Sequence, residues 1–243
     1  MYFDCHCHLD DPAFKDLDSV LDRCQKAGIK AIISNGTGGE SNRQVQVLAE
    51  KHPLIRPAYG LYPNQELDDT SELQWIRDQA LSKYPAVAIG EIGLDGVHEV
   101  TEAQLVRFRS ACKLAEELRL PVIVHSRKAE QQVLDELERF QGLVVLHCFN
   151  GSKRLIQEAS ARKYYFSIPA TIVKAQHFQM LVELVPLSQL LTETDAPYLS
   201  PDKEVFPNEP VNVVKTVEHI ARIKKLTVEE TMQALFMNYQ RVF

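Results

Sequence analysis

The sequence has few cysteines, and their spacing does not predict a disulfide framework. Five cysteines occur in 243 residues, an odd number, whereas small secreted domains carry more cysteines in even number. Cys5 and Cys7 flank a histidine, but structural zinc sites usually have two to four residues between their cysteines. We therefore interpret both as packing residues on the outer face of a strand. Free thiols indicate a reducing compartment, and we predict a cytoplasmic protein.

Long hydrophobic runs and an excess of basic residues are also missing. No apolar stretch approaches the roughly 20 residues that cross a membrane, and the first residues lack the pattern of a secretory signal. We therefore expect no membrane partner. The net charge of −6 argues against a broad basic surface for long duplex DNA, although bound metal ions could supply local positive charge. Without repeats, low-complexity tracts or linkers, residues 1–243 are predicted to form one domain.

Eight short apolar runs alternate with helical patterns along the chain. The runs predict strands at residues 2–4, 30–34, 56–59, 86–89, 121–124, 143–146, 164–168 and 189–192. Helices are predicted at residues 18–28, 40–51, 73–82, 101–118, 128–140, 154–162, 176–185, 211–224 and 227–236. This alternation predicts an α/β fold with a parallel sheet, and the length is close to the roughly 250 residues of a (β/α)8 TIM barrel. The competing fold, a doubly wound open sheet, would not bring together the ends of strands one, four, five, six and eight.

Six potential metal ligands lie at the downstream ends of those five runs: His6, His8, Glu91, His125, His147 and Asp195. A parallel barrel gathers the carboxyl ends of its strands at one mouth, so these side chains could meet there. His6 and His8 are two residues apart, which places both imidazoles on one face of a strand. Glu91, between glycines, has two oxygens that could bridge two ions. The set suits two divalent metal ions, and the sequence does not distinguish magnesium, manganese and zinc.

Several further residues are candidates for the chemistry. Asp195 is predicted to be catalytic together with Glu91, as a ligand and as proton acceptor from a metal-bound water; the alternative is that Asp195 begins the turn before a proline. Glu193, two positions before Asp195, would support a ligand. Asp95 is interpreted first as a residue that caps the next segment, and the alternative is a hydrogen bond to a ligand. Arg127 is the best candidate for contact with a substrate phosphate. The proline-rich connection 196–210 is either functional or a passive crossover.

Six stretches in fixed order resemble the TatD family of metal-dependent hydrolases. They are FDCHCHL (3–9), GEIGLD (90–95), LPVIVHSR (120–127), HCFNG (147–151), TETDAPYL (192–199) and NEP (208–210). The resemblance implies a barrel of the amidohydrolase type. It also implies one ion held by His6, His8, Glu91 and Asp195, and a second held by Glu91, His125 and His147. Members of this family are typically cytoplasmic deoxyribonucleases, some of which trim the 3′ ends of single strands, so DNA with single-stranded ends is the implied partner.

The chain departs from the family pattern at three places near the expected substrate. Tyr62 and Asn64 stand where the family usually has histidines, and we interpret them as candidate substrate contacts. Gly96 and Val97 follow the GLD motif where a tyrosine is common, and Pro207 precedes NEP in place of an arginine.

Three hypotheses for the function follow. The first is hydrolysis of DNA phosphodiester bonds through a metal-bound hydroxide. The alternative is a small-molecule esterase, lactonase or phosphotriesterase that uses the same hydroxide, which the departures at 62 and 64 favour. The third is a barrel that binds metal or a partner without turnover, which six intact candidate ligands disfavour.

Overall fold

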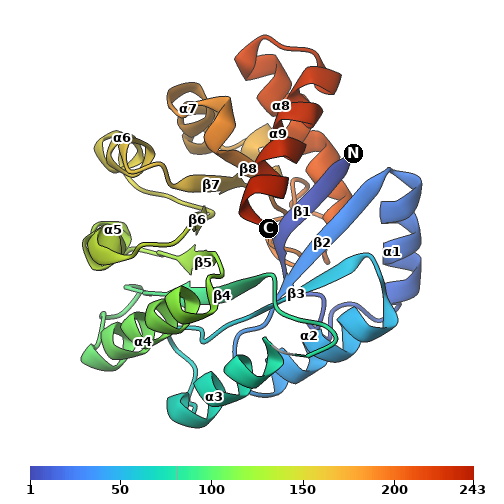
Figure 1. Ribbon diagram of the computed structural model, residues 1–243. Helices are drawn as coiled ribbons and strands as arrows, with labels where there is room; N and C mark the ends of the chain where they lie inside the picture. Colours follow the sequence, from blue (N-terminus) through green and yellow to red (C-terminus); the bar gives the residue numbers. More distant parts are fainter. Residues whose placement is uncertain (81) are drawn as a thin grey trace.

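The computed structural model describes residues 1–80 and 82–243, and its centre is one sheet of eight parallel strands. The strands are β1 (Tyr2–Cys7), β2 (Ile29–Asn35), β3 (Ile55–Tyr59), β4 (Ala88–Gly93), β5 (Val122–His125), β6 (Val144–His147), β7 (Tyr165–Ile168) and β8 (Leu190–Thr192). Each strand pairs with the next one along the chain, from β1 to β8. This order confirms the predicted barrel (Figure 1).

The helices surround the sheet, as the alternation predicts (Figure 1). They are α1 (Leu17–Lys26), α2 (Glu40–Lys51), α3 (Asp69–Gln79), α4 (Glu102–Leu118), α5 (Glu130–Glu136), α6 (Lys153–Ala161), α7 (Gln176–Leu184), α8 (Val213–Lys224) and α9 (Val228–Val242). Short 3-10 turns lie at Leu137–Arg139, Ala170–Val173, Leu187–Gln189 and Pro210–Asn212. In the described part of the chain, no helix combines the length and apolarity needed to cross a bilayer.

Hydrogen bonds between β1 and the segment after β8 close the barrel on the side of the candidate site. The backbone N–H of Asp195 donates to the carbonyl of His6 at 2.9 Å, and that of His8 donates to Ala196 at 2.7 Å. Buried Asp4 adds a side-chain link, because its Oδ1 accepts from the backbone N–H of Thr194 at 3.1 Å. Three of the candidate ligands are therefore fixed relative to one another by the backbone itself.

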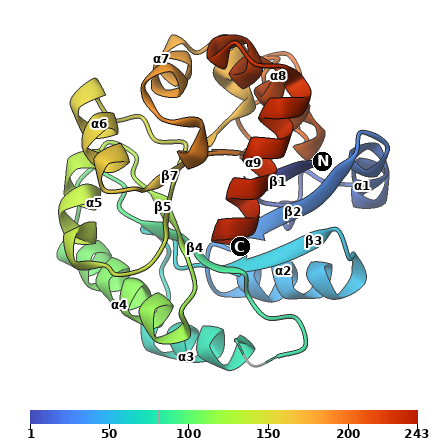
Figure 2. The same ribbon diagram turned by 45° about the horizontal axis from the view of Figure 1, so that its top comes forward.

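The last helix closes the opposite end of the barrel. α9 lies across the end where the strands begin, near both termini (Figure 2). The Asn238 amide on this helix donates to the carbonyls of Leu187 and Leu190, at 2.7 and 2.8 Å, where β8 starts. The ring of Tyr239 packs 4.6 Å from that of Phe3 in β1. The mouth with the candidate ligands is therefore the end that stays free for substrate.

Most predicted elements differ from the structure by no more than two residues at either end, but five differ by more. The helix predicted at 227–236 is α9, which continues six residues further to Val242. β1 continues to Cys7, so that His6 lies within the strand, and β4 runs from Ala88 to Gly93, so that it contains Glu91. α3 begins at Asp69, four residues earlier than predicted, because Asp68 caps it by accepting from the backbone N–H groups of Thr70 and Ser71. The predicted end of that helix, residues 81–82, includes residue 81, which lies outside the described residues. The helix predicted at 128–140 is α5 followed by a 3-10 turn.

The two amino-terminal cysteines are packing residues, as the sequence predicts, but only Cys7 lies on the outer face of β1. The Cys5 thiol lies beside Ser167 of β7, whose hydroxyl contacts buried Glu193, so Cys5 faces the inside of the barrel. Cys5 belongs to the large apolar cluster around the barrel, and Cys7 to a smaller cluster with Cys24 on α1. All three are buried and free of disulfide bonds. The pairing of β1 with β2 shifts register between Asp4 and Cys7, so strict alternation of faces does not hold there. His6 and His8 nevertheless lie close together, with ring centroids 5.0 Å apart.

Candidate metal centre

The structure brings all six predicted ligands together at the carboxyl ends of the strands. They form three overlapping groups: His6, His147 and Asp195; His6, His8 and Glu91; and Glu91, His125 and His147. Within each group the candidate ligand atoms lie within 4.8 Å of one another. The elements that carry them, β1, β4, β5, β6 and the segment after β8, are the five that the sequence indicates.

The first part of the cluster has the spacing of ligands around one ion. His6 Nε2 lies 3.5 Å from Asp195 Oδ1 and 3.8 Å from Glu91 Oε2. His8 Nε2 lies 3.4 Å from the same oxygen of Asp195 and 3.5 Å from that of Glu91. These separations are long for hydrogen bonds, but ligand atoms about 2.1 Å from a tetrahedral ion are about 3.4 Å apart. The four side chains therefore fit a shared divalent cation.

The second part of the cluster uses the other oxygen of Glu91. Glu91 Oε1 lies 2.8 Å from His125 Nδ1 and 3.6 Å from His147 Nε2. Glu91 is 3% exposed, so its carboxylate has no access to bulk water that could offset its charge. One buried carboxylate thus faces two groups of imidazoles, one with each oxygen.

His6 shows independently that this pocket needs a further partner. The side chain is fully buried, and neither ring nitrogen has a hydrogen-bond partner among the described residues. A buried polar atom without a partner costs roughly 1–3 kcal/mol. A cation at Nε2 would satisfy one of the two nitrogens, so the residues present fit a metal ion.

The electrostatics of the cluster also favour a cation. Burial lowers the pKa of His6 to about 4, which keeps the ring neutral, as a ligand must be. Burial opposes the charged forms of His8 and His147 as well, but the carboxylates of Asp195 and Glu193 outweigh it and raise these pKa values to about 9 and about 10. Despite burial, the surrounding histidines hold the pKa values of Glu91 and Asp195 below their ordinary range. The carboxylates therefore hold positive charge at this point, either as protons on His8 and His147 or as a metal ion that displaces these protons.

Three of the four histidines are oriented by an acceptor on the side away from the cluster. His147 Nδ1 lies 3.0 Å from Glu193 Oε2, and His8 Nδ1 lies 2.8 Å from the carbonyl oxygen of Asn35. His125 Nε2 lies 3.1 Å from Asp95 Oδ2. Such partners fix the tautomer, so that the opposite nitrogen keeps its lone pair for a metal. Glu193 lies where a supporting role requires it. Asp95 accepts from the backbone N–H of Val97, as a capping residue would, and also contacts a candidate metal ligand, His125.

The three candidate substrate contacts lie around the mouth and differ in whether their polar groups are already hydrogen-bonded within the protein. Arg127 is exposed, and its guanidinium has no ion-pair or hydrogen-bond partner among the described residues. The Tyr62 hydroxyl donates to Asp95 Oδ2 at 3.2 Å, and Asn64 Oδ1 accepts from Gln104 Nε2 at 2.9 Å. Of the three, Arg127 alone keeps its whole polar group open to a ligand.

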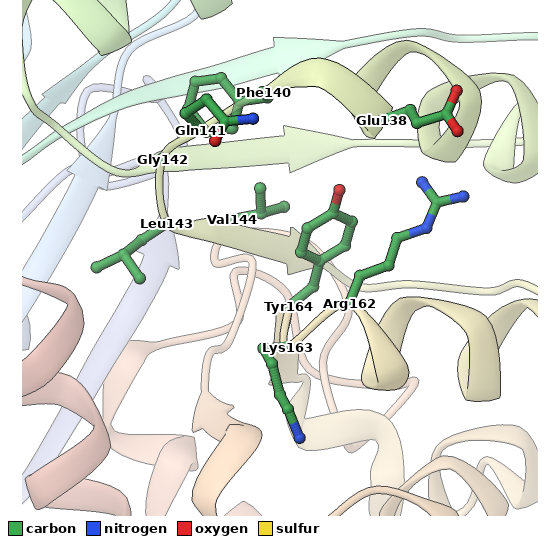
Figure 3. Close-up of a pocket in the computed structure, with 9 residues that line it drawn as sticks. All are labelled: Glu138, Phe140, Gln141, Gly142, Leu143, Val144, Arg162, Lys163 and Tyr164. Atoms are coloured by element: carbon green, nitrogen blue, oxygen red, sulfur yellow. The ribbon is translucent and has the colours of Figure 1, made fainter.

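A hollow elsewhere on the surface is unrelated to this cluster. It measures about 450 Å³ and is lined by residues at the amino ends of β6 and β7, including Leu143, Val144 and Tyr164 (Figure 3). In barrels of this type, chemistry occurs at the opposite end of the strands. The hollow therefore belongs to the closed end of the barrel.

Metal binding is expected to stabilise the fold measurably. A ligand present at 100 times its dissociation constant adds about 2.7 kcal/mol to the free energy of unfolding. For a chain of this length that corresponds to a rise in Tm of roughly 5–10 °C. Calorimetric scans with added zinc, manganese or magnesium, and again after a chelator, measure the effect. A Tm that none of the three ions changes would contradict the fit described above.

Barrel geometry and a buried cluster of imidazoles and carboxylates together define the class of metal-dependent barrel hydrolases. The sequence profile described as TatD related DNase matches residues 3–243. A human protein named deoxyribonuclease TATDN3 is 36% identical over 99% of this chain and 93% of its own length. An uncharacterized metal-dependent hydrolase of Methanocaldococcus jannaschii is 33% identical, and the match covers 100% of this chain and 96% of that protein.

A solved structure agrees with the sequence comparisons. The crystal structure of YjjV, a TatD homologue from Escherichia coli K12, superposes with a TM-score of 0.90 at 29% identity, covering 100% of this chain and 97% of that one. The chain belongs to the TatD family of metal-dependent hydrolases. The resemblance noted in the sequence and the barrel it implies are thereby confirmed.

Proposed function

We propose that this protein is a deoxyribonuclease that hydrolyses phosphodiester bonds with two divalent metal ions at the mouth of the barrel. The observation that carries the proposal is the position of Glu91, whose Oε2 faces His6 and His8 while its Oε1 faces His125 and His147. A carboxylate in that position can bridge two ions. The substrate class is supported by the description of the family and by the name of the human relative.

The ligands divide into two sets that share the bridge. His6, His8, Glu91 and Asp195 would hold one ion, and Glu91, His125 and His147 the other. When bound, such a pair activates water and stabilises negative charge on a phosphoryl oxygen. The nitrogen-rich ligation favours zinc or manganese over magnesium, which prefers oxygen ligands.

The protein's own side chains complete the reaction. Asp195 is the proposed proton acceptor, since its carboxylate lies beside the candidate ligands His6 and His8 and its side chain, 15% exposed, reaches the open mouth. Its φ of +55° is unusual for a residue other than glycine, and strained backbone of this kind gathers at functional sites. Arg127 would hold a substrate phosphate through two parallel hydrogen bonds. Asn64, exposed on the loop after β3, is a second candidate contact.

The remaining features of the proposal concern substrate form, location and organisation. Single-stranded DNA ends are the proposed substrate, because the net charge of −6 offers no excess of cations for binding long duplexes. Five free cysteines support a reducing compartment, the cytoplasm. One barrel and a family match over residues 3–243 support a single domain.

A direct assay tests the proposal. Metal-reconstituted protein is incubated with end-labelled single-stranded DNA, and separately with a panel of aryl esters, lactones and phosphotriesters. We expect DNA trimming that falls by about a hundredfold or more in His125→Ala, the order lost when one group that stabilises transition-state charge is removed. His98→Ala, an exposed histidine outside the cluster, is the matched control and should retain activity.

Two outcomes would contradict the proposal. Turnover confined to the small molecules would identify the alternative, a small-molecule hydrolase. No detectable activity on any substrate, despite two bound metal ions, would identify a metal-binding barrel without turnover.

A further inference from the structure

Asp95 is the meeting point of two loops and one candidate metal ligand. It follows β4 by two residues and is 4% exposed. Its Oδ1 accepts from the backbone N–H of Val97 at 2.9 Å. Its Oδ2 lies 3.1 Å from His125 Nε2 and accepts from the Tyr62 hydroxyl at 3.2 Å. Three donors from three different segments therefore fix one carboxylate.

This contact determines which nitrogen of His125 can bind a metal ion. An ionised carboxylate only accepts hydrogen bonds, so the hydrogen of a neutral His125 must be on Nε2. The lone pair is then on Nδ1, which lies 2.8 Å from Glu91 Oε1. Tyr62 also contacts the imidazole directly, edge-on, with ring centroids 5.0 Å apart. The Tyr62 phenol thus restricts the positions of the Asp95 carboxylate and of the His125 ring that this carboxylate orients.

Tyr62 is itself held by a buried arginine on α4. Arg107 is 8% exposed, and its Nη1 donates to the carbonyls of Tyr62, Pro63 and Gln65 at 2.9, 3.0 and 2.7 Å. Its Nε donates to Asp69 at 2.9 Å. Because one guanidinium binds three carbonyl oxygens of the loop after β3, the backbone of this loop has little conformational freedom. The hydroxyl of Tyr62 therefore reaches Asp95 from a fixed backbone.

Gln104, one helical turn before Arg107, connects the loop after β4 to the loop after β3. Its Oε1 accepts from the backbone N–H of Asp95 at 3.0 Å. Its Nε2 donates to Asn64 Oδ1 at 2.9 Å and to the carbonyl of Asp95 at 3.2 Å. α4 thus fixes the loops after β3 and β4 against each other, with the Tyr62–Asp95 hydrogen bond between them.

We propose that Tyr62 is a positioning residue that acts through Asp95 on His125 and sets metal affinity at the Glu91–His125–His147 position. The sequence alone suggested a substrate contact at this residue, but its hydroxyl is already committed to Asp95. The inference rests on the proposed metal centre and adds to it a determinant outside the ligand set. Substrate would then meet Arg127 and the exposed edge of the loop instead.

The test is a metal-binding isotherm of the purified full chain, measured with zinc against a competing chelator. The isotherm of a two-site protein has two binding components, and the one that is lost in His125→Ala belongs to the Glu91–His125–His147 position. In Tyr62→Phe we expect the affinity of that component to fall about tenfold, at the low end of the 10–100-fold loss seen when an orienting partner of a metal-binding histidine is removed. The other component should be unchanged. Tyr198→Phe is the matched control, because that phenol donates to Asp11 at the same mouth, at 2.9 Å.

A double-mutant cycle separates action through Asp95 from independent effects. If Tyr62 acts through Asp95, adding Tyr62→Phe to Asp95→Asn should weaken binding no further than Asp95→Asn alone, whereas independent effects would add. Tyr62→Phe with a wild-type isotherm overturns the inference, and a raised KM for DNA in that variant would restore the substrate role. A wild-type chain that binds no zinc at either position would instead overturn the proposed metal centre.

Discussion

Replacing Glu91 with alanine is expected to remove both metal ions and to lower hydrolytic activity at least about a thousandfold. Glu91 contributes an oxygen to each half of the cluster, so its loss takes a ligand from both positions at once. It also leaves four imidazoles without the carboxylate that faces them. A loss of two charge-stabilising ions exceeds the 10²–10³-fold effect of removing a single such group. Elemental analysis of the purified variant, alongside the DNA assay, measures both consequences.

Two control variants separate the bridge from a general effect of removing charge. Glu91→Gln keeps the shape and one carbonyl oxygen, so it should retain part of the metal but not the full pair. Glu204→Ala removes an exposed carboxylate from the long connection after β8 and should leave metal content and activity unchanged. A Glu91→Ala protein that keeps two equivalents of metal and its circular dichroism spectrum would refute the bridging role.

The fold could be predicted because its strands are covered on both sides. β5 and β6, for example, are entirely buried, so their sequences are continuous apolar runs that differ from the periodic helices around them. The convergence of the ligands followed from topology alone, since parallel strands end at one mouth. Neither inference required knowledge of any side-chain conformation.

The bounds of β4 could not be predicted in the same way. The strand contains Gly90 and Gly93, and glycine has low strand propensity, so the apolar run in the sequence ends at residue 89. The structure shows why the glycines are there. Gly93 has a φ of +139°, and a Cβ at this position would lie 2.0 Å from the carbonyl oxygen of His125. The close approach of β4 and β5, which sets Glu91 beside His125, thus requires glycine at position 93. The same glycine weakens the pattern by which a strand is recognised in the sequence.

The roles of Asp95, Gln104 and Arg107 depend on contacts between loops that sequence spacing does not encode. Asp95 meets a tyrosine 33 positions away and a histidine 30 positions away. One signal was nevertheless present in α4. Gln104 and Arg107 are polar but lie on the same face as buried Phe108 and Ala111, where an amphipathic helix should be apolar. Polar residues that interrupt a buried stripe must find partners, which here are the loops of the site.

Asp195→Asn is expected to lower kcat by about 10²–10⁴-fold while much of the metal remains bound, because it removes the proposed proton acceptor. The range is that of general base catalysis. The amide oxygen can still approach an ion from the position of Oδ1, which lies 3.4 Å from His8 Nε2 and 3.5 Å from His6 Nε2. An amide oxygen, however, cannot take a proton from the attacking water at neutral pH.

The ratio of activity loss to metal loss is therefore the informative quantity for Asp195. Single-turnover rates on labelled DNA, at metal concentrations that restore full occupancy, isolate the chemical step from binding. Asp202→Asn is the matched control, because it makes the same change at an exposed carboxylate of the same connection. If activity returns to within a few-fold of wild type once the metal is restored, Asp195 is only a ligand, and the proton must go to another base. If activity stays low at full occupancy, the side chain has the two roles that its position, between two histidines and the open mouth, makes possible.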